Sequence, residues 1–563
     1  MKRAALVAVA MGLLLVGGCG ADDDAAGVRA PEADPPAAHQ PEIEESDLFK
    51  LDGNHLYVQN PSTGFNVLDV TDPGQPRKLG NALGSGGKGS EMYIRGNQAI
   101  VLLESSSEKC IVPKGLDAKG WALTSQVLIV DHSSKTHPKV LERYCTPGQL
   151  VASRTVDQVL YLVQTNGTGS RAISLDISSP TSVQLIKQVE LPNAGKEIDI
   201  TPSAIFVASR TENPNHTAVT FIEIGPTGDL ATRGTVTVNG QPQGRFHMQA
   251  HGDQFRIVTF DSYQRQSILH VLDVSNPDAI KLLGRLENIG AGEQLYATRF
   301  DGDRAYVVTF RQTDPMWIIS LEDPENPVIV GELHVPGWSD FIFPRGDRLI
   351  TVGRGDRGGS LGLSLFDVSD PSAPRSVDQI SLGDASTTSE ANVDHRAVTI
   401  LQPEGKNPIV VVPHSVLSWE SGCELVEKLR FVEVEPERLQ SRGSVKQTGT
   451  IRRTFMVKSA LYSISDEEVL SVDIADLDSP AVNGQVTVGD GSASRNPGAT
   501  TYCNDWNNWN NSYPRDYVYE DDSGGYPFMW KCSVDDRGGA SLPPLMMLAG
   551  LLWLGVWAAR KRG

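Results

Sequence analysis

The chain has 563 residues, of which 39% are hydrophobic and 21% are charged, values typical of a packed globular body. Asp and Glu total 69 against 50 Lys and Arg, which gives a formal net charge of −19. Basic residues are not concentrated in any long stretch of the sequence. Such a chain repels phosphate backbones, which excludes a nucleic-acid partner. The 54 Gly and 34 Pro punctuate the chain, as expected for many short strands joined by turns.

The N-terminus has the pattern of a secretory signal over residues 1–19. Lys2 and Arg3 precede an apolar run, and small residues precede Cys19. The stretch "VGGC" resembles the lipobox of a bacterial lipoprotein signal, which implies lipidation of Cys19. The alternative is an ordinary cleaved signal with an incidental Cys. Residues 20–45, rich in Ala, Asp, Pro and Glu, predict a disordered tether.

A short β-unit then recurs along the chain. "LFDVSDPSAPRSVDQISLG" at Leu365 has counterparts at Leu272, Leu68 and Leu321. In each, a β-branched or apolar strand leads into an Asp/Ser-Pro turn and a second strand. The Asp or Ser side chain caps the reversal, and Pro fixes φ there. This recurring pattern therefore predicts repeated antiparallel strands.

The spacing of these units indicates the architecture. The residues that end the repeated strands are Asp69, Asp131, Asp176, Glu223, Asp273, Leu321, Asp367, Glu433 and Asp473. They recur about every fifty residues, the length of a four-stranded propeller blade. Two longer intervals predict insertions that contain Cys110 and Cys423. We predict an all-β fold: one β-propeller over 46–490 with four-stranded antiparallel blades. It has seven to nine blades, with eight the best guess because propellers usually have four to eight.

Several motifs resemble a family of secreted proteins with a C-terminal β-propeller domain. They are "VTFRQTDP", "VPGWSDFIF", "LSLFDVSDP" and "SEANVDHRA", and "IRRTFMVKSALYSISDEEVLSVDI" matches the closing strands. The resemblance covers roughly Asp47 to Gly489 and is most specific from Gly284 to Val398. It implies a propeller fold and an extracytoplasmic location. It implies neither a reaction nor site residues.

Few residues are candidates for chemistry. "PGWSD" places Trp338 and Asp340 on a loop that could bind a ligand, although Trp338 could equally pack between blades. "SEANVDHRA" offers Glu390, Asp394 and His395 as an acid/base set, or as an internal hydrogen-bond network between blades.

Two histidines, His247 and His251, have a spacing that would suit a metal on a helix. No helix is expected there and no Glu follows the first His, so a loop pair is favoured. No CxxC pair or Cys/His cluster has zinc spacing, and no metal or cofactor is predicted.

The remaining cysteines and the C-terminus suggest an exported chain. Proximity pairs Cys110 with Cys145 and Cys503 with Cys532. Residues 491–537, rich in Asn and aromatics, predict a stalk or cap, with glycan contact as the alternative.

The last segment, 538–563, resembles a Gram-negative C-terminal sorting tail of the Gly-Gly or myxobacterial type. Its apolar run before three cations just reaches the length of a membrane span. Cleavage during export and a permanent tail anchor are both open.

Two functions follow from this sequence. The first is a non-enzymatic scaffold, tethered at the cell envelope of a Gram-negative bacterium, that binds a protein or glycan partner. The second is a propeller enzyme, a hydrolase or lyase acting in the central channel. The first is favoured because no convergent set of ionisable residues is evident.

Overall fold

The computed structural model describes residues 43–82, 88–104, 109–191, 193–310, 314–335, 338–354, 360–383, 387–418 and 424–491. The predicted signal, stalk or cap and sorting tail lie outside the described residues, as do Cys19, Cys423, Cys503 and Cys532.

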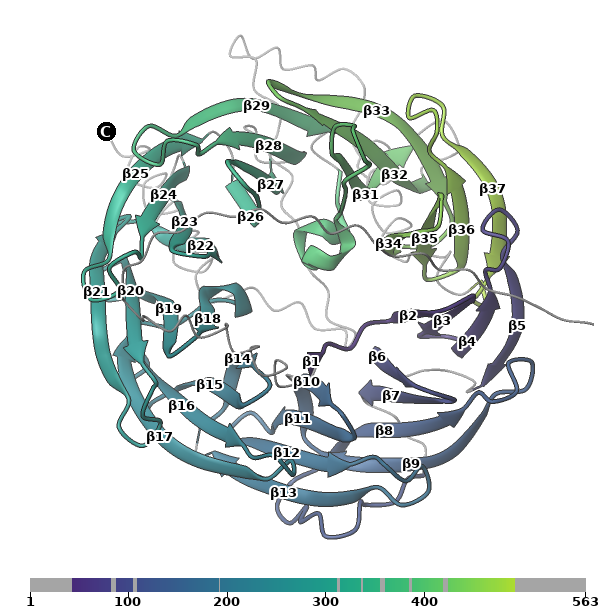
Figure 1. Cartoon of the computed structure of the whole chain (residues 1–563), viewed down its shortest axis with the longest axis horizontal. Coiled ribbons are helices and arrows are strands. Elements are labelled where there is room, and N and C mark those ends of the chain that lie inside the picture. The colour runs from purple at the N-terminus through teal and green to yellow at the C-terminus, as the bar shows by residue number, and fades with distance from the viewer. Residues whose placement is uncertain are drawn as a thin grey trace, which may run out of the picture. The chain divides into compact units, whose positions relative to one another are not determined.

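The described residues form a ring of nine antiparallel sheets around a central axis (Figure 1). We call the region enclosed by the innermost strands the channel. Each sheet is one blade, and its strands follow the chain from the channel outward. Blades 1 to 3 are β2 (Phe49–Asp52), β3 (His55–Asn60), β4 (Gly64–Asp69) and β5 (Arg77–Ala82); β6 (Lys88–Arg95), β7 (Gln98–Glu104), β8 (Leu123–Asp131) and β9 (Lys139–Pro147); β10 (Gln149–Val156), β11 (Val159–Thr165), β12 (Ser170–Asp176) and β13 (Gln184–Leu191).

Blades 4 to 6 are β14 (Gly195–Ile200), β15 (Ala204–Arg210), β16 (His216–Ile224) and β17 (Leu230–Asn239); β18 (Met248–His251), β19 (Gln254–Asp261), β20 (Gln266–Asp273) and β21 (Lys281–Ile289); β22 (Gln294–Asp301), β23 (Arg304–Phe310), β24 (Asp314–Ser320) and β25 (Val328–Val335). Blades 7 to 9 are β26 (Trp338–Arg345), β27 (Arg348–Arg354), β28 (Leu361–Asp367) and β29 (Arg375–Leu382); β30 (Thr399–Leu401), β31 (Ile409–Ser418), β32 (Glu424–Glu435) and β33 (Arg438–Gln447); β34 (Ile451–Val457), β35 (Ala460–Ser465), β36 (Glu468–Asp473) and β37 (Ala481–Thr487).

The predicted fold class is confirmed, and the best guess of eight blades is corrected to nine. All nine strand ends counted in the sequence fall at or near the end of a blade's third strand. The estimate of eight was wrong because it treated one of these pairs as an addition to a blade. Each marked unit in fact forms a complete blade.

The Asp that ends a third strand holds the turn that follows it. In six blades its carboxylate accepts a hydrogen bond of 2.8–3.0 Å from the backbone N–H two residues later. This local bond replaces the ladder bond that the chain loses when it leaves the sheet. The residues are Asp69, Asp131, Asp176, Asp273, Asp367 and Asp473.

Adjacent blades are joined by apolar side chains. Nine clusters of buried residues lie in the described part of the ring, one at each contact between neighbouring blades. Both faces of each sheet are therefore covered, which explains why the central strands read as continuous apolar runs. Burial of these faces is the main stabilising contribution that the sequence provides.

In six of the nine blades, a glycine in the outermost strand lets the blade approach the next one closely. A Cβ atom on Gly484 of β37 would lie 2.5 Å from Pro76 Cδ and 2.6 Å from the Gly74 oxygen, both in the third-to-fourth-strand turn of blade 1. Only glycine fits at that separation. Glycines in a comparable position are Gly80, Gly234, Gly284, Gly331 and Gly443.

The ring closes without a shared strand, since blade 1 and blade 9 are each built from one end of the described chain. One apolar cluster joins them, with Leu56 and Val58 against Tyr462 and Ile464. The Tyr462 hydroxyl also donates to the Pro73 oxygen at 2.9 Å. Closure therefore depends on side-chain packing between the two ends.

The first described strand, β1 (Ile43–Glu44), adds a fifth, innermost strand to blade 3 by pairing with β10. Ile43 and Glu44, which fall within the predicted 20–45 tether, thus form a strand, because they gain ladder partners in Val156 and Thr155. We call residues 43–47 the strap.

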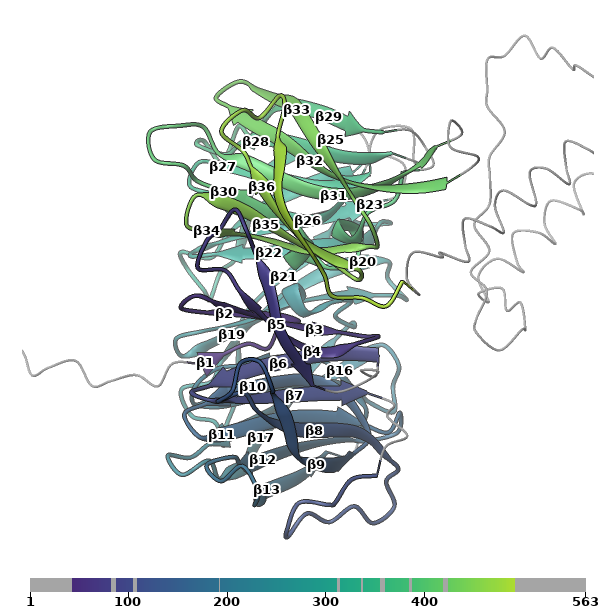
Figure 2. The same ribbon diagram turned by 90° about the vertical axis from the view of Figure 1, so that its right-hand side faces the viewer.

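The two faces of the ring differ. The turn face carries the first-to-second and third-to-fourth strand connections, such as 53–54 and 70–76. The loop face carries the second-to-third strand loops, such as 166–169, and the connections between blades, such as 240–247. Ile43 lies beside the turn after Val156, on the turn face. At the other end, the backbone N–H of Gly491 donates a hydrogen bond to the carboxylate of Glu467, which lies on the loop face. The two ends of the described chain therefore leave by opposite faces (Figure 2).

The insertion before β8 is fastened to blade 2 by the Cys110–Cys145 disulfide, with a Cα–Cα distance of 5.4 Å. This predicted pair is confirmed. The insertion continues over blades 2 and 3, where Leu116 is buried in the cluster between them.

Replacing Gly484 by Val is expected to lower the melting temperature, because the side chain collides with the blade 1 turn and overpacking costs roughly 1–3 kcal/mol. Thermal unfolding followed by circular dichroism measures the change. The matched control is Gly225→Ala, where the nearest heavy atom to a new Cβ is 3.5 Å away. Equal melting temperatures for Gly484→Val and the wild type would contradict this account of closure.

Candidate functional site in the central channel

The strap lies along the channel wall. Its three acidic residues, Glu44, Glu45 and Asp47, all form ion pairs there. Glu44 pairs with Arg95 and with Lys50, the latter at 2.7 Å. Glu45 pairs with Arg245 at 2.8 Å. Arg245 begins the 3-10 helix η1 (Arg245–His247), which connects blade 4 to blade 5.

Asp47, at the end of the strap, joins blades 8 and 9. Arg453 Nε of β34 donates to Asp47 at 2.9 Å, and Arg453 also pairs with Asp394 at 2.7 Å. Arg396 lies 3.8 Å from Asp47 and 3.1 Å from Glu91 of blade 2. The strap is therefore bound by ion pairs to parts of the chain more than 300 residues away.

Asp394 and Arg396 belong to the connection between blades 7 and 8, which contains short helices. The connection from β29 contains two 3-10 turns, η2 (Glu390–Asn392) and η3 (His395–Ala397), which lie toward the channel (Figure 1). The Asp394 side chain caps η3 by accepting from the Arg396 N–H. The motif "SEANVDHRA" thus forms a blade-connecting element that presents charges to the channel.

A second ion-pair group lies beside the first. Arg452 pairs with Glu390 at 2.8 Å and with Asp466 at 2.8 Å. Glu390, Asp394 and His395 therefore do not converge on one point. Arg452 holds Glu390, whereas Arg453 and Arg396 hold Asp394.

These contacts set the protonation of the site. Burial alone would raise the pKa of Asp394, but Arg453 and Arg396 outweigh it and lower the pKa to about 2. Burial lowers the pKa of His395 to about 4, with Arg245 acting in the same direction. At neutral pH the Asp is ionised and the His is uncharged.

The ring of His395 packs between aromatic side chains. Its centroid is 4.7 Å from Phe246 in an edge-to-face arrangement and 5.9 Å from Phe341. Asp340 accepts a hydrogen bond of 2.7 Å from Asn392 of η2, so it also contributes to the channel wall. Trp338 begins β26, and its side chain lies outside the described residues.

His247 and His251 do not act together. His247 is buried at 4% exposure, and burial lowers its pKa to about 4. His251 is exposed at the far end of β18. They occupy a 3-10 turn and a strand, where their spacing does not place them on one face.

A cavity of about 380 Å³, the channel cavity, adjoins the ion pairs. Its lining includes Pro61 and Asp466, at the loop-face ends of blades 1 and 9. Two polar side chains from neighbouring blades also line it, Gln59 of β3 and Glu104 of β7. Burial and the nearby Glu91 raise the pKa of Glu104.

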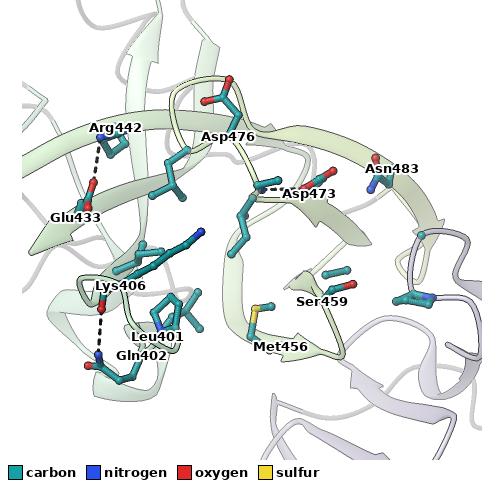
Figure 3. Close-up of a pocket in the computed structure, with 18 residues that line it drawn as sticks. Leu401, Gln402, Lys406, Glu433, Arg442, Met456, Ser459, Asp473, Asp476 and Asn483 are labelled. Carbon is teal, nitrogen blue, oxygen red and sulfur yellow. Dashed lines mark hydrogen bonds and ion pairs between the residues drawn. The ribbon is translucent and has the colours of Figure 1, made fainter.

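A second cavity of about 730 Å³ opens on the turn face between blades 8 and 9 (Figure 3). It forms beside the β30–β31 connection at 402–408, which is longer than the two-residue turns of most blades. Lys406 reaches toward its middle, and Arg442 at its edge pairs with Glu433 at 3.0 Å. Its floor, including Leu401 and Met456, belongs to the cluster between these blades.

The arginines and the strap were missed in the sequence. Arg452 and Arg453 are visible in "IRRTF", and Glu44, Glu45 and Asp47 in "EIEESD". No local pattern indicates that these two segments meet. In the described part of the chain, no group of three or more His, Cys, Asp or Glu could hold a metal ion.

The fold and this channel define the class of protein as a nine-bladed β-propeller with an internally ion-paired channel. The family described as "Beta propeller domain" matches residues 38–187 and 171–477. The chain belongs to this family, as the propeller motifs predicted.

Two relatives are uncharacterised archaeal proteins. One from Archaeoglobus fulgidus is 30% identical over 248 residues, covering 43% of this chain and 35% of the relative. One from Methanocaldococcus jannaschii is 36% identical over 148 residues, covering 26% of this chain and 24% of the relative. The chain thus spans about a third or less of the length of these relatives.

Solved structures with similar folds include a hypothetical selenium-binding protein from Sulfolobus tokodaii. It is 14% identical, with 62% of this chain and 91% of that chain covered and a TM-score of 0.34. A putative 6-phosphogluconolactonase from Bacteroides fragilis is 11% identical, with coverages of 59% and 98% and a TM-score of 0.35. These similarities concern the fold alone.

Among the described residues, no helix has the length and apolar character needed to cross a membrane. The predicted span at 542–559 lies outside them.

Replacing Arg453 by Leu should destabilise the fold by about 3–5 kcal/mol, because Asp47 and Asp394 then lose a buried partner. Chemical denaturation measures the loss. The control is Arg438→Leu, which removes an exposed pair with Glu435 and should change stability little. Similar losses in both variants would contradict a structural role for the channel ion pairs.

The stability of the protein should fall as the pH drops from about 6.5 to about 4. His395 binds a proton in the unfolded chain near pH 6.5 but in the folded protein only near pH 4, so acid favours unfolding across this window. The His395→Phe variant keeps an aromatic ring and cannot be protonated. Melting temperatures at pH 7 and pH 4.5 should differ less for this variant than for the wild type. An equal difference would exclude His395 as a contributor.

Proposed function

We propose that this protein is an exported β-propeller, held at the cell envelope of a Gram-negative bacterium, that binds a protein or glycan partner without chemical turnover. One observation carries the proposal: Glu390 and Asp394, the two channel carboxylates that the sequence offers as acid or base, are engaged by arginines. Their charges are used to hold the strap and the blade 8 entry in place.

The pairing argues against general acid–base catalysis by these residues. A catalytic carboxyl works best when its pKa lies near the operating pH and when it can reach a substrate proton. The pKa of Asp394 is about 2, and Arg453 and Arg396 occupy its oxygens. Glu390 faces Arg452 in the same manner. This geometry suits a rigid scaffold.

The direction of the strap supports an orientation at the envelope. Ile43 lies on the turn face, so a tether from a lipidated Cys19 would bring that face toward the membrane. The loop face, with the channel cavity, would then point toward partners. Loops on a rigid scaffold are common binding surfaces. Residues 491–537, the predicted stalk or cap, would supply further contacts to a glycan.

Replacing Cys19 by Ala should release the protein from membranes, because one acyl anchor and its processing are lost. The variant is made in a chain shortened before residue 538, which removes any contribution of the tail to membrane attachment. Cell fractionation then measures how much protein stays with the membrane. The control is the same shortened chain with Cys19 intact, which should remain in the membrane fraction. Equal distribution of the two proteins would refute lipidation at Cys19.

Binding without turnover predicts that envelope protein or glycan fractions retained by the purified protein are recovered chemically unchanged. Mass spectrometry of the fractions before and after prolonged incubation tests this. A product that disappears with Glu390→Gln or Asp394→Asn would instead establish a channel enzyme.

A further inference from the structure

The cavity of about 730 Å³ between blades 8 and 9, which we call the turn-face cavity, has an apolar floor (Figure 3). Met456, Ile474 and Leu477 line this floor, and each is a half-buried side chain that packs against the cluster between the two blades. The buried Leu401 and Ile409 complete it. Concave sites with apolar walls and a few polar groups are typical binding sites, because a ligand with an apolar group covers such a surface.

Five charged residues line the turn-face cavity, and four of them are engaged within the protein. Glu433 and Arg442 pair with each other at 3.0 Å. Asp473 and Asp476 each accept a hydrogen bond from the backbone of their own turn, at 2.8 and 3.0 Å. The ammonium of Lys406 reaches toward the middle of the cavity and has no hydrogen bond or ion pair within the described residues. Lys406 is exposed, so this charge is accessible to a ligand.

The loop that carries Lys406 is held in place by bonds of its own. The backbone N–H of Lys406 donates to the Pro403 oxygen at 3.2 Å, which closes a turn. The side-chain amide of the next residue, Asn407, donates to Glu433 of β32 at 2.9 Å. The Lys406 side chain therefore starts from a fixed point beside the floor, which lowers the cost of ordering the site when a ligand binds.

These groups together restrict the chemistry of the ligand. The Lys406 ammonium is complemented by a carboxylate. The negative charges of Asp473 and Asp476, on the blade 9 side, disfavour a dianion such as a phosphate monoester. Each of these two carboxylates uses one oxygen for its turn, which leaves the other for a donor on the ligand. The last residue of a polypeptide combines a carboxylate, an apolar side chain and a backbone N–H, whereas a fatty acid has no donor.

We propose that the turn-face cavity binds the C-terminal residue of a partner polypeptide, with its α-carboxylate at Lys406 and its apolar side chain on the floor. The volume of about 730 Å³ lies within the usual range for sites that enclose a small ligand or a chain end. This inference rests on the proposed binding function, because it specifies a protein partner and adds the turn face as a place of contact.

The test is fluorescence anisotropy of the purified full-length protein with the peptide Gly-Ala-Ala-Leu, which carries a dye at its N-terminus. The peptide with a free C-terminal carboxylate should bind. The same peptide with a C-terminal amide lacks the charge, and a peptide ending in Ser lacks the apolar side chain, so each should bind more weakly by about tenfold or more. Equal binding of either peptide would overturn the assignment. Tighter binding of laurate, measured by displacement of the peptide, would also overturn it, because the cavity would then be a fatty-acid site.

The Lys406→Gln variant tests the carboxylate contact. It should weaken binding of the free-carboxylate peptide about tenfold and leave binding of the amide unchanged, so that the two peptides bind alike. Its melting temperature should equal that of the wild type, because Lys406 is exposed. The matched control is Lys281→Gln, which removes another exposed lysine at the start of β21 and should bind as the wild type does. Unchanged binding in Lys406→Gln, or equal weakening of both peptides, would contradict the contact.

The Met456→Gln variant tests the floor. The new side chain has a similar length but is polar, so the peptide ending in Leu should lose its advantage over the peptide ending in Ser. An unchanged preference for Leu in the folded variant would show that the floor does not hold the side chain, and would overturn the inference.

The outcome with the wild type also separates this inference from the proposed function. No binding of the free-carboxylate peptide overturns the inference. If the wild type then still retains an unmodified envelope partner, the proposed function stands and only the site and the partner class are wrong. If it retains neither, both proposals fail.

Discussion

The contact between one blade and the next is the constraint on which the structure depends. A four-stranded sheet with apolar side chains on both faces cannot be covered by its own residues. Each blade must lie against two others, and the nine apolar clusters show this at every contact in the described ring. Glycines such as Gly331 and Gly484 set how closely the blades approach. Because no strand is shared between blades 1 and 9, the last contact must be as well packed as the others.

Much of the fold could be predicted because its signals are local. The Asp that ends a third strand caps its own turn two residues later, so the sequence of a single unit reveals the strand, the turn and the next strand. Repetition then reveals the ring. The predicted range of seven to nine blades includes the observed nine, and only the best guess of eight is too low, because propellers usually have four to eight blades. The strap was missed because its strand, β1, is two residues long and pairs with a partner over 100 residues away.

The channel shows the opposite situation. Glu390, Asp394 and His395 were identified from one motif, but their partners Arg452, Arg453 and Phe246 lie elsewhere in the chain. Whether a carboxylate serves chemistry or structure is decided by those partners, and sequence spacing does not contain that information. Sequence spacing likewise does not indicate that Gln59 and Glu104 line the same cavity, because they do so only after blades 1 and 2 have packed together.

The strap also gives the protein a defined order of assembly. Asp47 is among the first residues of the body to be synthesised, and its partner Arg453 follows 406 residues later. At about 5–20 residues per second, a ribosome needs roughly 20–80 seconds to cover that distance. Throughout this time the acidic strap has no arginine from blades 8 or 9 to neutralise it. The end of the strap can complete its ion pairs only when blades 8 and 9 exist, whereas its pairing with β10 needs blade 3 alone. One of the first parts of the body to be synthesised therefore has contacts that are among the last to form.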